Sequence, residues 1–546
     1  MGASGEHAGG RRGQTGGVHR QDQGRGRAGG CGGGERRRCG DDQENRGERH
    51  RRRRTGRGER DRGTGRRSHD GRERGRLQCT TGDARSLALE ALTKVRRDDA
   101  FANLVLPTLL ERVRLERRDA AFATALTYGT LRLRGRYDAV LSHCVDRPLG
   151  QLDDDVLDIL RLGAHQLMGM RVPTHAAVSS TVDLASDAAG RGAAAFVNAV
   201  LRRVCERDLD AWLAQLRADA PDEAGALAAV ESHPLWVVKA MRQALLAQDR
   251  PVEELADLLY ADNTDPEVAL CARPGLVSPE HLAKEAGSVT SREPRPGDVS
   301  PCAVVLTGGD PGRIRAVRES RAGVEDEGSQ LVALMLADAP LKGRDERWLD
   351  LCAGPGGKAA LLGARALQRG ARLVANETAP HRARLIETCV RALPRDVVAV
   401  RRGDGRRFGH DEPAAWDRVL VDAPCSGLGS LRRRPEARWR RTAKDVNELA
   451  ELQRELLTSA LATVRPGGVV AYTTCSPHVL ETEYVVRDVT RRLDRRGQRV
   501  EVLHAGNAAT RLAPRPPAGA ERRMLQLWPH LEGTDAMFCA LLRRVD

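Results

Sequence analysis

The sequence lacks several features that would place it in well-defined classes of protein. None of its 12 cysteines belongs to a Cys-x-x-Cys pair, which argues against a zinc ribbon and a thioredoxin-like redox motif. No apolar run approaches the ~20 residues that a membrane-spanning helix needs, and the amino terminus has no apolar segment typical of a secretory signal. We therefore expect a cytoplasmic protein with reduced thiols, no membrane partner and no bound metal.

Lysine is scarce, and positive charge is spread unevenly along the chain. Residues 1–78 hold 22 arginines, no lysine and 11 acidic residues, so they supply +11 of the net charge of +14. An RNA partner must therefore be argued from sites in the rest of the chain and not from bulk charge. Because residues 1–78 have almost no large apolar side chains, we expect a disordered Arg/Gly-rich tail. Such a tail can contact RNA or be dispensable, and we favour the second interpretation.

The 546 residues are enough for two or three domains, and the hydrophobic pattern divides them. Residues 84–215 carry apolar side chains at helical spacing, which predicts an all-α domain. Residues 217–231 are rich in Ala, Asp and Glu, and they predict a linker or a capping helix. Residues 232–320 mix helices with short strands and Gly/Pro turns, which is typical of a small α+β segment.

Residues 321–546 have the pattern of an α/β domain. Strands are predicted at 348–351, 373–375, 397–400, 418–422 and 469–474, with helical stretches between them such as 359–369 and 445–464. Strands that alternate with crossover helices predict βαβ units and a Rossmann-like parallel sheet. Ligands of such sheets bind beyond the carboxyl ends of the strands.

The first of these strands runs into a glycine-rich turn, within "DLCAGPGGK". Glycines let the backbone approach a ligand closely, and the helix that follows presents unpaired N–H groups. The turn fits neither the P-loop spacing nor G-x-G-x-x-G, so on its own an ordinary strand-to-helix turn accounts for it equally well. The residues of the turn are Cys352, Ala353, Gly354, Pro355, Gly356, Gly357 and Lys358.

Acidic residues follow the next three strands. Glu377 stands 20 residues past Gly357, where a carboxylate can accept both ribose hydroxyls of a nucleoside cofactor, although a solvated surface glutamate is the alternative. Asp404 follows the third strand and can reach an adenine amino group, although Asp-Gly is also a turn signal. Asp422 ends the fourth strand. Such a site needs no lysine that clamps phosphate, which favours S-adenosylmethionine over NAD or ATP.

Two cysteines follow the fourth and fifth strands, in "VDAPCSGLGS" and "VAYTTCSPH". Cysteine is common in buried strands, so a small apolar filler is the simplest interpretation of either residue. The two strands are expected to end side by side, which would bring Cys425 and Cys475 to one pocket near the cofactor. Two thiols there suit cytosine chemistry, because a thiolate that adds to carbon 6 makes carbon 5 nucleophilic. Spacing alone does not show which thiol attacks.

Several arginines are candidates for contact with RNA phosphates, and a solvated face is the alternative for each. Three of them stand directly after the loop that contains Cys425: Arg432, Arg433 and Arg434. Four others belong to the helical region: Arg132, Arg134, Arg202 and Arg203.

Taken together, the motifs resemble a known family. "DLCAGPGGK", "DAPCSGLG" and "YTTCSPHVLETE" resemble the motifs of RNA cytosine-5 methyltransferases, and "TYGTLR", "HAAVSSTVDLA" and "FVNAVLRR" resemble a NusB-like domain. With "SHPLWVV", "VEDEGSQLVA" and "GTDAMFCALLRR", roughly residues 84–546 resemble the RsmB/Sun/Fmu family of bacterial 16S rRNA cytosine-5 methyltransferases. The resemblance does not cover the Arg/Gly-rich tail.

The resemblance implies a Rossmann-like domain that binds S-adenosylmethionine, preceded by a NusB-like RNA-binding domain. It implies that residues 352–358, with Glu377, Asp404 and Asp422, contact the cofactor. The family often has Ala at the place of Gly354 and Asp at the place of Glu377, and both changes preserve the physical role.

The resemblance also implies roles for the two thiols. It makes Cys475 the nucleophile, with Cys425 assisting release of the product, and Asp422 also supports the cytosine ring near N3. DNA cytosine-5 methyltransferases use the cysteine of a Pro-Cys motif, which would be Cys425, but the "TTCS" ending resembles the RNA enzymes. We expect a monomer that acts on 16S rRNA. The alternatives are a tRNA cytosine-5 methyltransferase and a non-catalytic RNA-binding scaffold.

Overall fold

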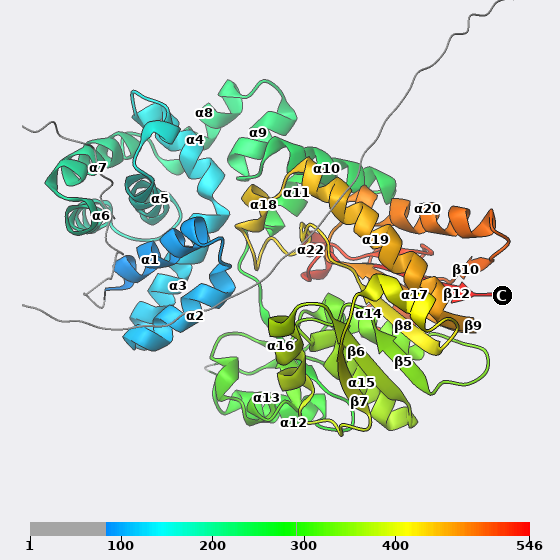
Figure 1. The fold of residues 1–546 in the computed structure, drawn as a ribbon. Helices are drawn as coiled ribbons and strands as arrows, with labels where there is room; N and C mark the ends of the chain where they lie inside the picture. The colour runs from blue at the N-terminus through cyan, green and yellow to red at the C-terminus, as the bar shows by residue number, and fades with distance from the viewer. Residues whose placement is uncertain (1–82, 291) are drawn as a thin grey trace, which may run out of the picture. The chain divides into compact units, whose positions relative to one another are not determined.

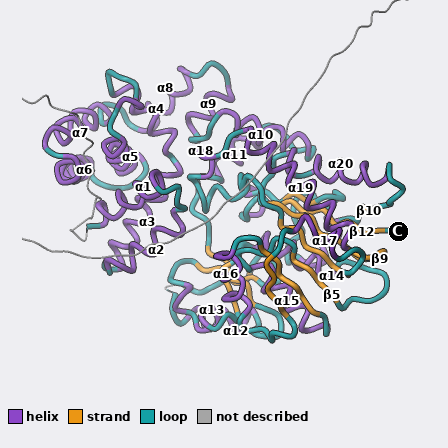
Figure 2. The backbone as a smooth tube through the Cα atoms, in the orientation of Figure 1, coloured by secondary structure: helices purple, strands orange, loops and turns teal. Residues whose placement is uncertain are grey.

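The computed structural model describes residues 83–290 and 292–546, and the predicted tail over residues 1–78 lies outside them (Figure 1). Among the described residues, every helix is too short or too polar to cross a membrane. The first described segment is helical, as its pattern predicts (Figure 2). Its helices are α1 (Ala84–Arg97), α2 (Ala102–Val113), α3 (Arg117–Arg132), α4 (Arg134–Cys144), η1 (Leu149–Gln151), α5 (Asp154–Met168), α6 (Thr174–Ala189), α7 (Arg191–Val204) and α8 (Leu209–Asp219).

Helix α1 shows why this segment forms a helical domain. Asp83 caps the helix, because its side chain accepts hydrogen bonds from the backbone N–H groups of Arg85 and Ser86. The apolar stripe that includes Leu87 and Val95 is buried, and α1 packs on α3 and α5. Burial of such a stripe, more than local propensity, stabilises a helix of this length.

Three further helices lead away from this domain: α9 (Glu223–Val230), α10 (Leu235–Ala247) and α11 (Glu254–Ala261). Helix α9 lies within residues 217–231, for which the sequence predicts either a linker or a capping helix. Its N-cap is Asp222, which accepts a hydrogen bond from the Gly225 N–H at 2.6 Å.

A small antiparallel sheet follows, with strand order β2-β3-β1-β4. Its elements are β1 (Val268–Ala272), α12 (Pro279–Gly287), β2 (Arg295–Pro296), β3 (Ala303–Leu306), η2 (Pro311–Arg313), α13 (Arg315–Arg318) and β4 (Ala322–Val324). Residues from the strands and from both α-helices form one apolar core. The mixed α+β character of this segment is as predicted.

The rest of the chain is built on a larger sheet, with strand order β10-β12-β9-β8-β5-β6-β7. Its strands are β5 (Arg347–Asp350), β6 (Arg372–Glu377), β7 (Val398–Arg402), β8 (Trp416–Asp422), β9 (Val464–Thr474), β10 (Val500–Val502) and β12 (Phe538–Arg544), and β11 (Leu525–Gln526) pairs with β12. Its helices are α14 (Glu327–Asp338), α15 (Gly357–Arg369), α16 (Pro380–Val390), η3 (Gly405–Arg407), α17 (Phe408–Asp411), α18 (Ala437–Arg440), α19 (Ala443–Thr463), η4 (Val479–Glu481), α20 (Glu483–Asp494), α21 (Ala505–Leu512) and α22 (Pro529–Glu532).

The large sheet has an apolar core on each face. Along β9, Val469 and Ala471 belong to one core, together with residues of α14, α15 and α21. The alternate residues Val470 and Tyr472 belong to the other core, together with residues of α19 and α20. Successive side chains of a strand point to opposite faces of the sheet, so a strand that is covered on both faces contributes alternate residues to two cores.

The direction of the strands confirms part of the prediction and corrects the rest. Strands β5 to β9 pair in parallel, as predicted. Strands β10, β11 and β12 pair antiparallel, and the sequence pattern does not reveal them. Strand β12 is buried over Phe538–Leu542, so it shows no alternation, and β10 and β11 are too short for a periodic signal.

The register brings three strand ends to one edge. Asp350 at the end of β5 pairs with Leu420 of β8, and Asp422 at the end of β8 pairs with Thr473 of β9. Because these strands are parallel, the loops that follow them leave from the same edge of the sheet. The glycine-rich turn and both cysteine loops therefore begin side by side.

Candidate active site at the carboxyl edge of the large sheet

The glycine-rich turn between β5 and α15 is fixed by a buried amide in β6. The side chain of Asn376 donates hydrogen bonds to the carbonyls of Leu351 and Gly403, both at 3.0 Å. The Ala353 N–H in turn donates to the Asn376 carbonyl at 2.8 Å. Asn376 thus joins the loops that follow β5 and β7. Sequence reasoning missed it, because an asparagine within a strand belongs to no recognisable motif.

Glu377 lies against this turn. It is buried, accepts a hydrogen bond from the Ala379 N–H at 3.0 Å and pairs with Arg382 at 3.4 Å. Arg382 also donates to the Gly354 carbonyl at 2.5 Å. A Cβ atom at Gly354 would lie 2.3 Å from the Glu377 Oε2 atom, so with a glutamate at 377 this close approach favours glycine, and an alanine would displace the carboxylate.

Asp350 is a second carboxylate beside the turn, and the sequence analysis did not single it out. It is fully buried, and among the described residues no side chain donates a hydrogen bond to its carboxylate. Burial, reinforced by the charge of Asp422, raises the pKa of Asp350 to about 8. A carboxyl group in this state is poised to gain a cationic partner.

Lys358 connects the glycine-rich turn to the end of β8. Its Nζ atom lies 3.0 Å from Asp422 Oδ2 and donates to Ser329 Oγ at 3.2 Å. The Thr473 hydroxyl donates to the other oxygen of Asp422 at 3.2 Å. Burial opposes the charge of Lys358, but the carboxylates of Asp422 and Glu325 prevail and raise the pKa of Lys358. The lysine is therefore a fixed positive charge at the sheet edge.

The two cysteine loops meet at their thiols. The Sγ atoms of Cys425 and Cys475 are 3.4 Å apart, although 50 residues separate them in the sequence. The Gly429 N–H donates to the Cys475 carbonyl at 2.9 Å. A Cβ atom at Gly429 would lie 2.9 Å from the Cys475 carbonyl oxygen and 2.4 Å from that of Ala536, just before β12, so glycine lets the first loop pack closely against both the second loop and this segment.

The surroundings of the two thiols differ. The hydrogen bond from Cys425 lowers the pKa of Cys475, and the Lys358 ammonium acts in the same direction, against burial and the charge of Asp422. The same hydrogen bond raises the pKa of Cys425 well above its ordinary value, and burial and the charge of Glu481 add to this effect. The two pKa shifts are opposite in direction, and they favour the thiolate at Cys475 over the thiolate at Cys425.

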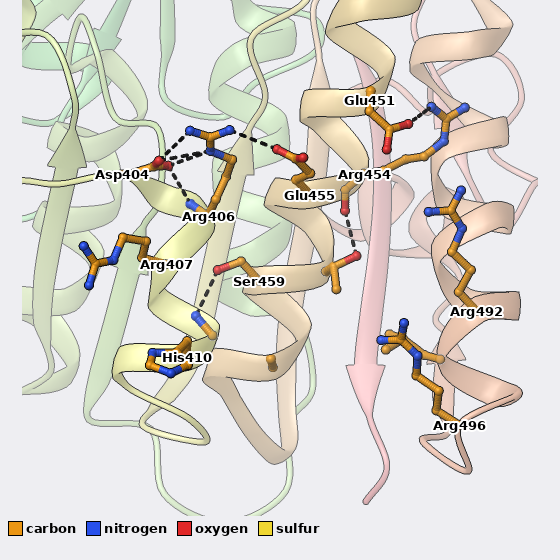
Figure 3. Close-up of a pocket in the computed structure, with 14 residues that line it drawn as sticks. Asp404, Arg406, Arg407, His410, Glu451, Arg454, Glu455, Ser459, Arg492 and Arg496 are labelled. Atoms are coloured by element: carbon orange, nitrogen blue, oxygen red, sulfur yellow. Dashed lines mark hydrogen bonds and ion pairs between the residues drawn. The ribbon is translucent and has the colours of Figure 1, made fainter. Parts of the chain in front are cut away.

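Asp404 lies beside a separate groove of about 600 Å³, between η3, α17, α19 and α20 (Figure 3). It accepts hydrogen bonds from the backbone and the guanidinium group of Arg406, and these lower the pKa of Asp404. Arg406 also pairs with Glu455 at 3.1 Å, and Arg454 pairs with Glu451 at 3.1 Å. Most of the charge in this groove is thus compensated internally, and neither thiol lines it.

Comparison with known proteins identifies the family to which the chain belongs. The family model described as "NusB family" matches residues 82–206, and the one described as "16S rRNA methyltransferase RsmB/F" matches residues 339–543. The protein named "Putative methyltransferase Rv1407" of Mycobacterium tuberculosis is 48% identical over 475 residues, which cover 87% of this chain and 99% of that protein. The chain belongs to the RsmB/F family. Ribosomal RNA small subunit methyltransferase B of Erwinia tasmaniensis is 32% identical over 412 residues, 72% of this chain and 86% of that relative.

Solved structures agree with the fold of an RsmB/F enzyme. The crystal structure of PH0851 superposes with a TM-score of 0.66 at 20% identity, over 84% of this chain and 97% of that one. As a member of the RsmB/F family, the protein is an RNA cytosine-5 methyltransferase that uses S-adenosylmethionine.

The residues at the sheet edge of this RsmB/F enzyme fit S-adenosylmethionine. The unpaired, buried carboxyl of Asp350 suits the ammonium group of the cofactor's methionine part. Glu377 presents a carboxylate beside a turn that has no side chain at Gly354, which suits a ribose. Asp404 differs from these two, because its carboxylate already accepts four hydrogen bonds from Arg406, about as many as it has acceptor sites, and a contact with the cofactor requires Arg406 to move.

The contact between Gly354 and Glu377 leads to a first prediction. Gly354→Ala is expected to weaken binding of S-adenosylhomocysteine by roughly tenfold, because overpacking costs about 1–3 kcal/mol. Glu377→Asp shortens the opposing side chain, so the double variant is expected to regain most of this loss. Isothermal titration calorimetry on all four proteins measures the coupling. Strictly additive losses would show that the two positions do not share one space.

Two of the three arginines that follow Cys425 correct both interpretations of that run, and the third, Arg434, is exposed. Arg432 is buried and donates to the Gly533 carbonyl at 2.8 Å. Arg433 pairs with Asp326 at 2.8 Å and with Asp535 at 3.1 Å. These two side chains are therefore structural, neither solvated nor free to meet phosphates, because the loop folds back onto buried acids. Arg434 instead lies over the ring of Phe101, 5.3 Å from its centroid.

The arginines of the helical region differ from one another. Arg132 is buried and donates to the Arg432 carbonyl at 3.0 Å and to Asp265, so neither the phosphate-contact nor the solvated interpretation holds for it. Arg134 lies over the ring of Trp439. Arg203 pairs with Asp146 at 3.1 Å, and Arg202 is exposed.

Proposed function

We propose that this RsmB/F enzyme methylates carbon 5 of a cytosine in 16S rRNA through a covalent adduct with Cys475. The observation that carries the proposal is the pair of thiols 3.4 Å apart, with opposite pKa shifts, at the edge where Lys358 and Asp422 also lie. Residues 352–358, with Glu377, Asp404 and Asp422, are proposed to contact the cofactor. Asp350 joins them as a partner for its ammonium group.

The attack uses the thiolate of Cys475. A bond forms between its sulfur and carbon 6, and the electrons of the carbon 5–carbon 6 double bond move toward N3 and O2 of the ring. Lys358 holds a proton on Nζ, 3.0 Å from Asp422. This pair can share a proton with N3 as negative charge develops there. S-adenosylmethionine, when bound, supplies the methyl group that carbon 5 takes.

Release of the product uses Cys425. The proton on carbon 5 leaves to a base, the double bond re-forms, and the bond between carbon 6 and the Cys475 sulfur breaks. The Cys425 thiol can donate a hydrogen bond to the departing sulfur across the 3.4 Å that separates them. A better-stabilised thiolate leaves faster, which accounts for a second cysteine at the site.

The choice of ribosomal RNA rests on the relatives. Proteins named ribosomal RNA small subunit methyltransferase B match most of the chain, and the amino-terminal helices match the NusB family. We propose that these helices bind the RNA. The reaction is proposed to take place in the cytoplasm, with the enzyme as a monomer. A looped or single-stranded cytosine is the target that costs less free energy to bind, because a base within a duplex must first leave its stack.

Bisulfite sequencing of 16S rRNA from a deletion strain tests the substrate. One methylated cytosine is expected to disappear and to return when the wild-type gene is restored, but not when a Cys475→Ala gene is restored. An unchanged 16S map would remove the ribosomal assignment. A lost site in tRNA would instead identify tRNA as the substrate.

A further inference from the structure

A buried carboxylate joins the two loops that carry the thiols. Glu481 lies in η4 and is fully buried. Its Oε1 atom accepts a hydrogen bond from the Ser426 N–H at 2.7 Å, and its Oε2 atom accepts one from the Ser476 hydroxyl at 2.7 Å. The Ser426 hydroxyl also donates to Oε2, and the two serine oxygens are 3.1 Å apart.

The serines are the immediate neighbours of the thiols. Ser426 follows Cys425, and Ser476 follows Cys475. A single side chain thus bonds to the residue after each cysteine, without bonding to either sulfur. Neither the attack nor the release described above uses Glu481. Its burial and its three short bonds nevertheless place it where a small shift would change the distance between the sulfurs.

The carboxylate is itself held in place from the far side. The side-chain amide of Gln453 donates to Glu481 Oε1 at 3.2 Å and to the Pro424 carbonyl at 2.8 Å. The Tyr472 hydroxyl donates to the Glu481 carbonyl at 2.7 Å. Gln453 comes from α19 and Tyr472 from β9, so rigid elements fix the group that bonds both loops. Fully satisfied buried networks of this kind favour one arrangement of their members.

We propose that Glu481 is a positioning residue that clamps the Cys425 and Cys475 loops together and so holds the two sulfurs in register for attack and release. The proposal rests on the thiol chemistry of the proposed function. A carboxylate suits the task, because it accepts from two N–H groups and two hydroxyls at once. A glutamine has one acceptor oxygen and an NH₂ group in place of the second, so it cannot satisfy the same four donors.

The clamp can be tested with a matched control on the same stretch of chain. Glu483 is also a buried glutamate, but it accepts from Gln248 at 2.7 Å and pairs with Arg487 at 2.6 Å, away from the serines. Glu481→Gln is expected to lower kcat by about tenfold, and Glu481→Ala by about a hundredfold, because a misplacement of about 1 Å can cost that much. The KM for RNA should change little. Glu483→Gln should keep the wild-type kcat.

Two further measurements separate positioning from folding. In a Cys425→Ala background, Glu481→Gln should slow accumulation of the protein–RNA adduct, while thermal unfolding stays close to that of Glu483→Gln. Adding Ser476→Ala to Glu481→Gln should lower kcat little further, since the bond from Ser476 to the carboxylate is already lost and only the weaker contacts with Ser426 Oγ and the His478 N–H are removed in addition. Wild-type kcat and adduct rates in Glu481→Gln would overturn the clamp. A loss no greater than that of Glu483→Gln, or a loss seen only in KM, would do the same.

A readout that needs no methyl transfer keeps the clamp distinguishable from the proposed function. Diamide oxidises two adjacent thiols to a disulfide, and peptide mass spectrometry quantifies the link between Cys425 and Cys475. Glu481→Gln and Glu481→Ala should form this disulfide at least severalfold more slowly than wild type and Glu483→Gln. If Cys425→Ala traps no adduct but the disulfide rates differ as expected, the catalytic roles fail and the clamp stands. Equal disulfide rates in all four proteins would overturn the clamp.

Discussion

Cys475→Ala is expected to abolish methyl transfer, and Cys425→Ala is expected to trap the enzyme on its RNA. Removal of the attacking sulfur leaves carbon 5 unactivated, so the rate should fall by at least about a thousandfold, as for other removed nucleophiles. Removal of Cys425 leaves the attack possible but takes away the hydrogen bond to the departing sulfur, 3.4 Å away. The adduct should then accumulate as a band that survives denaturing electrophoresis.

The control for this pair of variants is Cys205→Ala. Cys205 is an exposed free cysteine at the end of α7, so its removal should change neither activity nor adduct. An adduct that accumulates with Cys475→Ala and not with Cys425→Ala would reverse the two roles. A double variant should form no adduct in either case, because neither thiol of the pair remains to attack carbon 6.

The five parallel strands and the three motifs were accessible from the sequence because each depends on local signals. A glycine-rich turn after an apolar strand, an acid at the end of a strand and a cysteine after a strand can all be recognised within ten residues. The parallel pairing of β8 and β9 then follows from crossover rules, and with it the meeting of Cys425 with Cys475. The proximity of these two cysteines is the longest-range contact that could be inferred without the structure.

The residues that the sequence did not reveal act through contacts distant in the chain. Asn376 bonds to loops on either side of its strand, and Glu481 bonds to two serines that are 50 residues apart. Charge-based reasoning failed for Arg432 and Arg433 for the same reason, since their acidic partners come from other segments. Which partner a long polar side chain finds is decided by tertiary packing and leaves no local pattern.

Lys358→Met is expected to lower the methyl-transfer rate by about a hundredfold at neutral pH and to move the rising limb of the pH profile upward. The Lys358 ammonium favours the thiolate of Cys475, so its loss raises the pKa of that thiol and leaves less thiolate near pH 7. The rate should therefore recover in part as the pH is raised toward 9. Loss of the proton that Lys358 shares with Asp422 should keep the recovery incomplete.

Alkylation of Cys475 by iodoacetamide, followed by peptide mass spectrometry across the pH range, measures the thiolate directly and needs no RNA. Its midpoint should move to higher pH in Lys358→Met and stay in place in Lys444→Met, because Lys444 is an exposed lysine on α19. Removing one partner of a buried pair can cost about 3–5 kcal/mol of stability, so Lys358→Met is compared with Lys358→Met/Asp422→Asn, which removes the unpaired charge. An unchanged alkylation midpoint in a folded Lys358→Met protein would mean that the hydrogen bond from Cys425 alone sets the ionisation of Cys475.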